Sequence, residues 1–214
     1  MADASTAEVR LVATPEGQAR VRVIAPGRRP LGTVLLSHGA GGQRDSADVA
    51  ALAEALPRDG WIVVLVDQPW RVAGRRIAAA PPRLDAAYVP IVETLVSGPT
   101  PLPAPLVSAG RSAGARVVCR TAHAVAADAV LAVSFPLHPP GRPDRSRYDE
   151  LAGAMRLGVP VWVVQGERDA FGTPGELRDA GLPEGSLREV RGTHTPHPGD
   201  VVAAARDVLA GLGS

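Results

Sequence analysis

"PLVSAGRSAGARV", residues 105–117, joins an apolar run to a run rich in Ala and Val through a turn that holds Gly110, Ser112 and Gly114. The first run predicts a strand and the second predicts a helix. A match to the pattern G-x-S-x-G alone means little, because Gly and Ser are common turn formers. Between a strand and a helix, however, the pattern predicts a sharp turn that lifts the Ser112 hydroxyl out of the edge of a sheet.

Apolar runs and amphipathic runs alternate along the rest of the chain. We expect a hairpin from residues 8–13 and 19–25, because the turn signal "TPEG" lies between these short runs. Further strands are expected at residues 32–37, 61–67, 105–109, 129–135, 159–165 and 186–191, and helices at 46–56, 82–96, 113–126, 146–157, 174–180 and 199–212. The alternation predicts a mostly parallel sheet with helices on both faces and functional residues at the carboxyl ends of the strands.

The composition predicts one soluble domain. The chain has 214 residues, 45% of them hydrophobic, which suits a single well-buried core over residues 1–214. Its formal net charge is +1, so the charge predicts binding neither to nucleic acid nor to an anionic membrane. Cys119 is the single cysteine, and no segment has the pattern of a signal peptide or a membrane span. We therefore expect a cytoplasmic protein without an intrachain disulfide.

A serine hydroxyl is a weak nucleophile until a base takes its proton, so a catalytic Ser112 needs a histidine. His194 and His197 lie in "VRGTHTPHPGD", directly after the last expected strand, which places both at the active edge of the sheet. We prefer His194 as the base, because it lies nearer the end of the strand. His123 falls inside the expected helix 113–126 and is interpreted as a structural residue.

The base needs a carboxylate that fixes its tautomer and stabilises the imidazolium ion. The segment "VVQGERDAFG" after the expected strand 159–165 offers Asp169, with Glu167 as the alternative. The resulting chain order is Ser112, Asp169, His194, and each of the three follows a strand. This agreement among three separate motifs is far more specific than G-x-S-x-G alone.

Negative charge that develops on the reacting oxygen needs two N–H donors. We expect one donor to be the amide of Ala113, next to the nucleophile, and the other to be the amide of Ala40 in "HGAGG". The glycines from Gly39 to Gly42 let this loop bend close to a substrate. The alternative of a phosphate-binding loop is disfavoured, because the segment lacks both the G-K-[ST] ending and the G-x-G-x-x-G spacing.

Other polar residues follow strands as well. Arg71, Arg75 and Arg76 come after the expected strand 61–67 and could bind an acidic substrate group, but we prefer to interpret them as solvated surface residues, because every basic residue of this chain is arginine. His138, in "PLHPPG", could line the pocket or stabilise its loop through a hydrogen bond. No metal-ligand spacing is visible, so we expect neither a metal ion nor another cofactor. No stretch is long enough for a lid, which predicts a shallow, open pocket.

Six motifs together resemble the α/β-hydrolase superfamily, and most of all its small dienelactone-hydrolase-like branch, which includes uncharacterised bacterial hydrolases and their testis-expressed and histone-acetyltransferase-complex relatives. The motifs are "LLSHGAGG", "VDQPWRVAGRR", "SAGRSAGARV", "SFPLHPPGRP", "VVQGERDAFGTP" and "VRGTHT". The resemblance implies a three-layer α/β sandwich around an eight-stranded sheet, with one antiparallel strand near its start and no separate lid domain. It also implies that Ser112, Asp169 and His194 form a catalytic triad.

The chain departs from dienelactone hydrolases proper, which use a cysteine nucleophile where Ser112 stands. Cys119 lies two helical turns beyond Ser112 and is interpreted as a packing residue. The sequence therefore predicts a serine hydrolase that cleaves an ester or related acyl bond of a small substrate with water. Two alternatives remain: an acyltransferase or thioesterase with the same triad, and a non-catalytic interaction module that keeps the fold. The intact triad favours an enzyme.

Overall fold

The computed structural model describes residues 7–41 and 45–212. Its strands are β1 (Glu8–Thr14), β2 (Gly17–Ile24), β3 (Gly32–Ser37), β4 (Trp61–Asp67), β5 (Leu106–Arg111), β6 (Ala129–Val133), β7 (Val161–Gly166) and β8 (Leu187–Val190). Its helices are α1 (Ala47–Asp59), α2 (Pro69–Val72), α3 (Pro81–Ser97), α4 (Ala113–Thr121), α5 (Tyr148–Arg156), α6 (Pro174–Asp179) and α7 (Pro198–Ala210), with a 3₁₀ turn at Glu184–Ser186.

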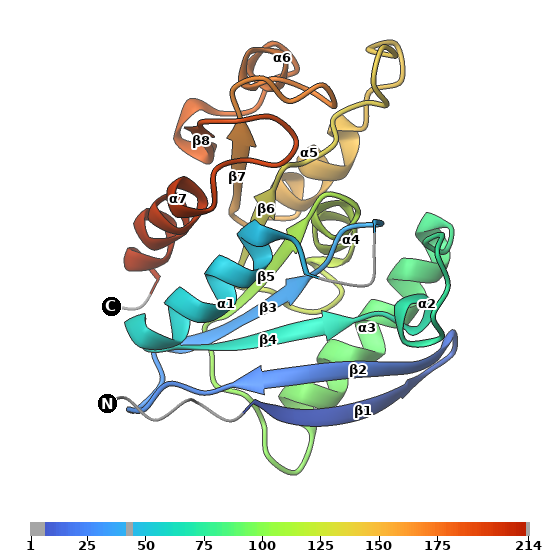
Figure 1. The fold of residues 1–214 in the computed structure, drawn as a ribbon, viewed down its shortest axis with the longest axis vertical. Helices are drawn as coiled ribbons and strands as arrows, with labels where there is room; N and C mark the ends of the chain where they lie inside the picture. The colour runs from blue at the N-terminus through green and yellow to red at the C-terminus, as the bar shows by residue number, and fades with distance from the viewer. Residues whose placement is uncertain (1–6, 42–44, 213–214) are drawn as a thin grey trace.

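The strands form one eight-stranded sheet in the order β1-β2-β4-β3-β5-β6-β7-β8 (Figure 1). Only β2 runs against its neighbours, so the expected mostly parallel sheet with one antiparallel strand near the start is confirmed. The parallel strands share one direction, and their carboxyl ends meet along one edge of the sheet (Figure 1). Within the described residues, no insertion forms a separate lid domain above this edge.

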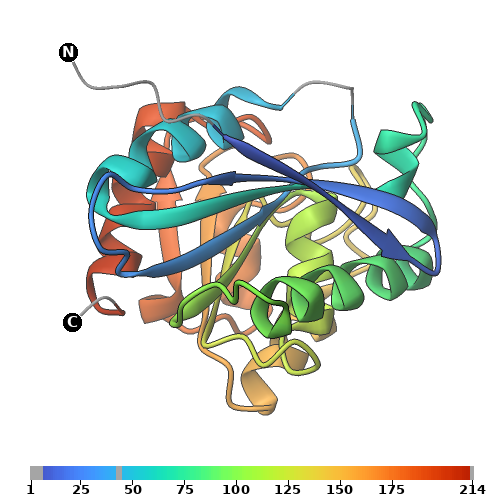
Figure 2. The ribbon, with the colours of Figure 1, turned by 90° about the horizontal axis from the view of Figure 1, so that it is seen from below.

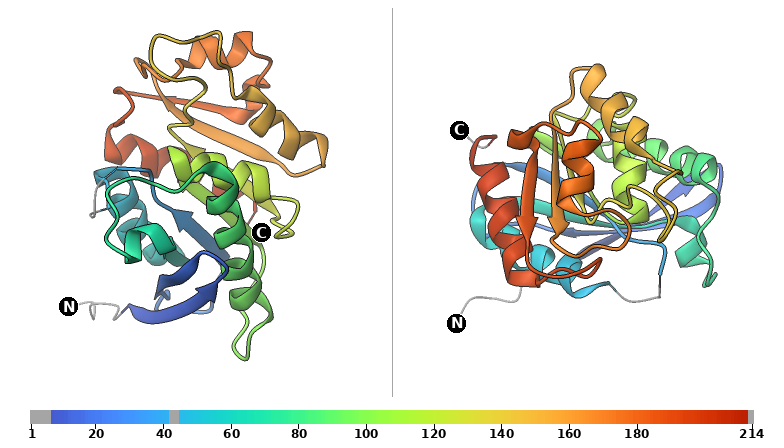
Figure 3. Two further views of the ribbon diagram at one scale, coloured as in Figure 1. Left: turned by 90° about the vertical axis from the view of Figure 1, so that its right-hand side faces the viewer. Right: turned by 90° about the horizontal axis from the view of Figure 1, so that it is seen from above.

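Helices cover both faces of the sheet, which makes the molecule a three-layer sandwich (Figure 2). On one face, α1 and α7 pack against each other and against the strands, whereas α3, α4 and α5 cover the other face. The same layers are seen from two further sides in Figure 3. Because both faces are covered, β3 and β4 are buried along their whole length, as their continuous apolar sequences predict.

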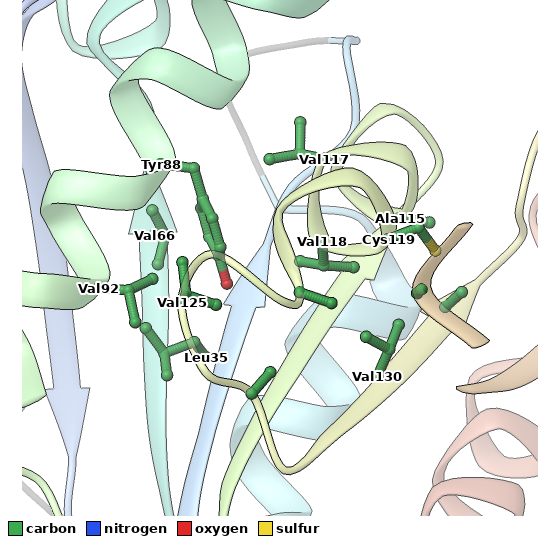
Figure 4. Packing of buried hydrophobic residues seen from close by; sticks show 14 of the residues in the cluster. Leu35, Val66, Tyr88, Val92, Ala115, Val117, Val118, Cys119, Val125 and Val130 are labelled. Atoms are coloured by element: carbon green, nitrogen blue, oxygen red, sulfur yellow. The ribbon is translucent and has the colours of Figure 1, made fainter. Parts of the chain in front are cut away.

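The larger core cluster fills the space between the sheet and the α3, α4 and α5 layer (Figure 4). Tyr88 lies fully buried in it, and its hydroxyl lies 3.3 Å from Ser108 Oγ on β5. This burial raises the pKa of Tyr88 to about 12. Cys119 is buried in the same cluster, as expected of a packing residue, and burial raises the pKa of its thiol.

One predicted helix is shorter in the structure, and one helix of the structure was not predicted. The helix expected over residues 113–126 ends at Thr121, and a turn follows in which Ala126 takes a positive φ of 50°. His123 therefore lies exposed in this turn, and the prediction that it lies inside a helix is wrong. The helix α2 was not predicted, because a single turn is too short to show helical periodicity.

Candidate active site

Ser112 occupies a strained turn between β5 and α4, with φ 54° and ψ −113°. Few residues other than glycine adopt a positive φ, and such strain is common where a side chain must be held for function. A Cβ at Gly110 would lie 2.4 Å from the backbone of Gly114, and a Cβ at Gly114 would lie 2.5 Å from the carbonyl oxygen of Ser37. Both glycines are therefore required, because strand, helix and the end of β3 approach one another so closely.

The side chain of His194 lies between those of Ser112 and Asp169. His194 Nε2 is 2.9 Å from Ser112 Oγ, and His194 Nδ1 is 2.8 Å from Asp169 Oδ2. This geometry fits a neutral ring in which Nδ1–H donates to the carboxylate and Nε2 accepts the proton of the serine hydroxyl. The ring of Phe171 packs against that of His194, with ring centroids 4.2 Å apart. The three residues that the sequence singled out thus form one hydrogen-bonded chain.

Asp169 is almost fully buried, at 1% exposure, and its oxygens are held by more than His194. Gln165 Nε2 donates to Asp169 Oδ2 at 3.0 Å, and the backbone N–H of Phe171 donates to Oδ1 at 2.8 Å. These donors orient the carboxylate toward His194. Gln165 and Phe171 were not predicted from the sequence, although an amide at the end of the apolar strand β7 is an unusual residue that could have pointed to Gln165.

The alternative residues lie elsewhere. Glu167 is exposed and pairs with Arg168, 3.3 Å away. His197 precedes α7 with its side chain 58% exposed, and its nearest carboxylate is that of Asp200, at 3.5 Å. Neither residue joins the hydrogen-bonded chain that begins at Ser112.

His138 is buried and bonded within its own region. Its Nε2 lies 3.1 Å from Glu176 and its Nδ1 lies 2.9 Å from the carbonyl oxygen of Pro139. Of the two roles considered for His138, the structure shows the loop-stabilising hydrogen bond.

The loop after β3 passes directly against the serine. A Cβ at Gly39 would lie 3.4 Å from the Cβ of Ser112, and the exposed Ala40 follows Gly39. Ala113 is the first residue of α4, where backbone N–H groups have no acceptor within the helix. The role of Ala40 and Ala113 as oxyanion donors stays a prediction. Gly42, which the sequence analysis included in this loop, lies outside the described residues.

A buried histidine braces the same loop. His38 Nδ1 lies 2.7 Å from the carbonyl oxygen of Gly39, and its Nε2 accepts a hydrogen bond from the Gln68 N–H at 3.2 Å. Burial lowers the pKa of His38, which favours the neutral ring that these two bonds need. His38 therefore ties the loop after β3 to the end of β4.

Arg71 is buried rather than solvated. Its Nη1 lies 3.0 Å from Asp45 Oδ1 and 3.2 Å from Asp67 Oδ1, with 4% of the side chain exposed. The interpretation of Arg71 as a solvated surface residue is therefore wrong. Asp45 and Asp67 also pair with Arg22, so Arg71 belongs to a cluster of ion pairs. Arg75 and Arg76 are exposed at the same edge of the sheet.

A hollow of about 320 Å³ opens beside this region, between the β1–β2 turn, α2 and the start of α3. Gln68 and Trp70 form part of its wall and also line a gap of about 10 Å³ that reaches Gly39 and Ala113. The hollow and this gap thus share Gln68 and Trp70 as wall residues.

Two negative findings concern only residues 7–41 and 45–212. No helix there has the length and apolar character that crossing a membrane requires. No group of three or more His, Cys, Asp or Glu side chains there is arranged to hold a metal ion.

Solved structures share this fold over nearly their whole length. An α/β serine hydrolase homologue from Coxiella burnetii has 17% identity and a TM-score of 0.76, with 99% of this chain and 100% of that chain covered. An α/β serine hydrolase without a lid from Xanthomonas campestris has 19% identity and a TM-score of 0.72, with coverage of 100% and 99%. A dienelactone hydrolase from Anabaena variabilis has 18% identity and a TM-score of 0.69, with coverage of 96% and 97%.

No functionally curated protein matches the sequence. At these sequence identities, the similarity to the solved structures shows the fold alone. A family model described as "Alpha/beta hydrolase domain" matches residues 30–194, which is well over half of the chain and includes Ser112, Asp169 and His194. The strained serine turn, the strand order and this match agree, and the chain belongs to the α/β-hydrolase domain family.

Proposed function

We propose that this protein is a serine hydrolase that cleaves an ester or related acyl bond of a small substrate through an acyl-enzyme. The observation that carries the proposal is the hydrogen-bonded chain from Asp169 through His194 to Ser112, with the serine on a strained turn. Fold membership alone supports a hydrolase. The triad geometry supports the more specific reaction, because each group stands where nucleophilic acyl transfer needs it.

The first half of the reaction transfers the acyl group to the enzyme. His194 Nε2 takes the proton of Ser112 Oγ while Oγ forms a bond to the acyl carbon, and the carbonyl electron pair moves onto its oxygen. The amides of Ala40 and Ala113 are proposed to donate to this oxyanion. When the intermediate collapses, the bond to the leaving group breaks, and His194 gives its proton to the departing oxygen.

The second half returns the free enzyme. His194 takes a proton from water, the hydroxyl oxygen bonds to the acyl carbon, and the bond to Ser112 Oγ breaks with return of the proton to the serine. Asp169 stays ionised and stabilises the imidazolium ion in both halves. The active edge carries no separate lid within the described residues, which supports small or exposed acyl groups as substrates.

The same triad would serve an acyltransferase or a thioesterase, which differ only in the acceptor or leaving group. We prefer water as the acceptor, because the serine is partly exposed at an open edge. The single, buried Cys119 supports a reducing compartment, and we propose the cytoplasm.

A covalent labelling experiment tests the proposal. Wild-type protein should be labelled by a fluorophosphonate and should hydrolyse short-chain p-nitrophenyl esters, whereas Ser112→Ala should do neither. Cys119→Ala is the matched control, since that thiol is buried and should leave labelling unchanged. Absence of labelling in folded wild-type protein would favour the non-catalytic interaction module.

A further inference from the structure

Arg111 stands directly before Ser112, as the last residue of β5, and its side chain reaches the loop that carries the base. Arg111 Nη2 donates to the backbone carbonyl oxygen of His194 at 2.8 Å. The two residues are 83 positions apart in the chain. One guanidinium thus links the strand of the nucleophile to the main chain of the base.

On its other side, the guanidinium faces a buried carboxylate. Arg111 Nε lies 3.5 Å from Asp48 Oδ2, and Asp48, in the first turn of α1, is 0% exposed. Asp48 Oδ1 accepts a hydrogen bond from the Val49 N–H at 2.9 Å, while Oδ2 has no hydrogen bond within the described residues. Among the described residues, Arg111 is the cation paired with this side of Asp48, and the pair restrains the direction of the guanidinium.

The same side chain also backs the loop after β3. A Cβ at Gly39 would lie 3.1 Å from Arg111 Nη1 and 3.4 Å from Arg111 Cδ. Arg111 thus touches three segments around Ser112: the loop of the base, the loop expected to supply an oxyanion donor, and the start of α1. Its side chain is only 14% exposed, so the surrounding protein leaves it little freedom to move.

We infer that Arg111, anchored by Asp48, is a positioning residue that holds His194 in line with Ser112. The inference rests on the proposed function, because alignment matters only if His194 acts as the base. The planar guanidinium of arginine suits this task, since one N–H group donates to the His194 carbonyl while the delocalised charge faces Asp48. A lysine offers one point charge and cannot match both directions.

Kinetics separate positioning from simple stabilisation. Arg111→Met should lower kcat for p-nitrophenyl acetate by up to ~10²-fold with KM little changed, because small misplacements of a catalytic group cost this much. Arg111→Lys should recover part of the loss. If Arg111→Met does not fold, Asp48→Asn removes the anchoring charge with the same side-chain shape and should lower kcat in the same direction by a smaller factor.

Arg116→Met is the matched control. Arg116, on α4, makes a bidentate pair with Glu150 at 2.6 and 2.9 Å, and its side chain is buried to a similar extent. Its loss should leave kcat near the wild-type value even if thermal stability falls. An equal kcat for folded Arg111→Met, Asp48→Asn and wild type would overturn the inference and leave Arg111 a structural tie.

A measurement independent of turnover distinguishes this inference from the proposed function. The proton between His194 Nδ1 and Asp169 should give a low-field proton NMR signal in wild-type protein and in Arg116→Met, and the signal should be lost or broadened in Arg111→Met. If the signal responds in this way while wild type neither hydrolyses esters nor takes a label, the proposed function fails and the positioning stands. A signal that Arg111→Met leaves unchanged contradicts the positioning.

Discussion

Asp169 forms no covalent bond in the proposed reaction, so its substitution separates orientation from chemistry. Asp169→Asn keeps the size of the side chain but replaces a carboxylate that accepts from His194 Nδ1, and the amide favours the wrong tautomer. We expect a folded variant whose kcat for p-nitrophenyl esters falls by up to ~10⁴-fold, the loss known for the same change in a serine protease. KM should change little, because the hydrogen bond between His194 and Asp169 strengthens only as the imidazolium ion forms.

Glu167→Gln is the control for this prediction, since Glu167 lies in the same loop but is exposed and pairs with Arg168. Its kcat should stay close to wild type. Equal losses in the two variants would contradict the assignment of Asp169, and a larger loss in Glu167→Gln would transfer the role to that residue.

The sequence predicted which side chains meet at Ser112, but not what holds them. Asp169 and His194 could be singled out because each follows a strand and has the chemistry that a triad needs. Arg111 could not, because its contact with the His194 carbonyl joins residues 83 positions apart. Arg71 was misjudged in part for the same reason, since its partner Asp45 lies 26 positions away, although its other partner, Asp67, lies only four residues before it.

At the scale of elements, the loop that carries His194 is fastened at both ends. Arg191, at its start, makes two hydrogen bonds to Asp200 in the first turn of α7, at 2.7 and 2.9 Å. The His197 N–H also donates to the Arg191 carbonyl oxygen at 2.9 Å. These contacts close the loop into a short bend from β8 to α7, so the position of His194 depends on the joint between two elements.

The Arg191–Asp200 pair predicts a pH effect on stability. The hydrogen bonds from Arg191 lower the pKa of Asp200 from its ordinary 3.8 to about 2. A carboxyl whose pKa is depressed in the folded state stabilises it above the unfolded pKa, and this contribution is lost as pH falls through the folded value. We expect the Tm of the wild type to fall between about pH 4 and 2, and the Tm of Asp200→Asn to fall less over the same window.

Thermal unfolding followed by circular dichroism across that pH range checks this expectation. At neutral pH the variant should lose little Tm, because the pair is exposed and screened by solvent. If the Tm of both proteins falls equally between about pH 4 and 2, the Arg191–Asp200 pair contributes nothing to the stability of the folded protein.

Strands were easier to predict than helices. β4 matches its expected range because a strand covered on both faces is apolar throughout. The expected helix 113–126 was too long, because residues beyond Thr121 keep an apolar pattern: Ala122 and Val125 are buried although the chain has already turned. Periodicity reports burial, and it cannot tell a helix from a turn that packs on the same core.

At the scale of the whole molecule, strand order decides what surrounds the serine. β5 lies between β3 on one side and β6, β7 and β8 on the other, so the loop after β3 and the loops of Asp169 and His194 flank Ser112. Alternating strands and helices predicted the parallel sheet but not this order, and the family resemblance added only the number of strands and the one antiparallel strand. Pairing between strands far apart in the chain leaves no local pattern in the sequence.

The hollow between the β1–β2 turn, α2 and α3 is another product of the whole fold, and it shares the wall residues Gln68 and Trp70 with the gap that reaches Gly39 and Ala113. Ala79→Phe should fill part of this space of about 320 Å³. If a longer acyl chain enters the hollow, the kcat/KM ratio of p-nitrophenyl butyrate to acetate should fall by about 10-fold or more, since each methylene in an apolar pocket is worth a factor of this order.

Ala210→Phe provides a control at the opposite edge of the sheet. Ala210 lines a separate hollow of about 220 Å³ together with Leu31 and Trp61, which stand at the amino ends of β3 and β4. The same substitution there should leave the butyrate-to-acetate ratio unchanged, because the amino ends lie away from Ser112. A ratio that Ala79→Phe also leaves unchanged would place the acyl chain outside the hollow. An equal loss for both esters would instead indicate that the added ring disturbs the loop after β3, because blocking a side pocket penalises only the substrate that reaches into it.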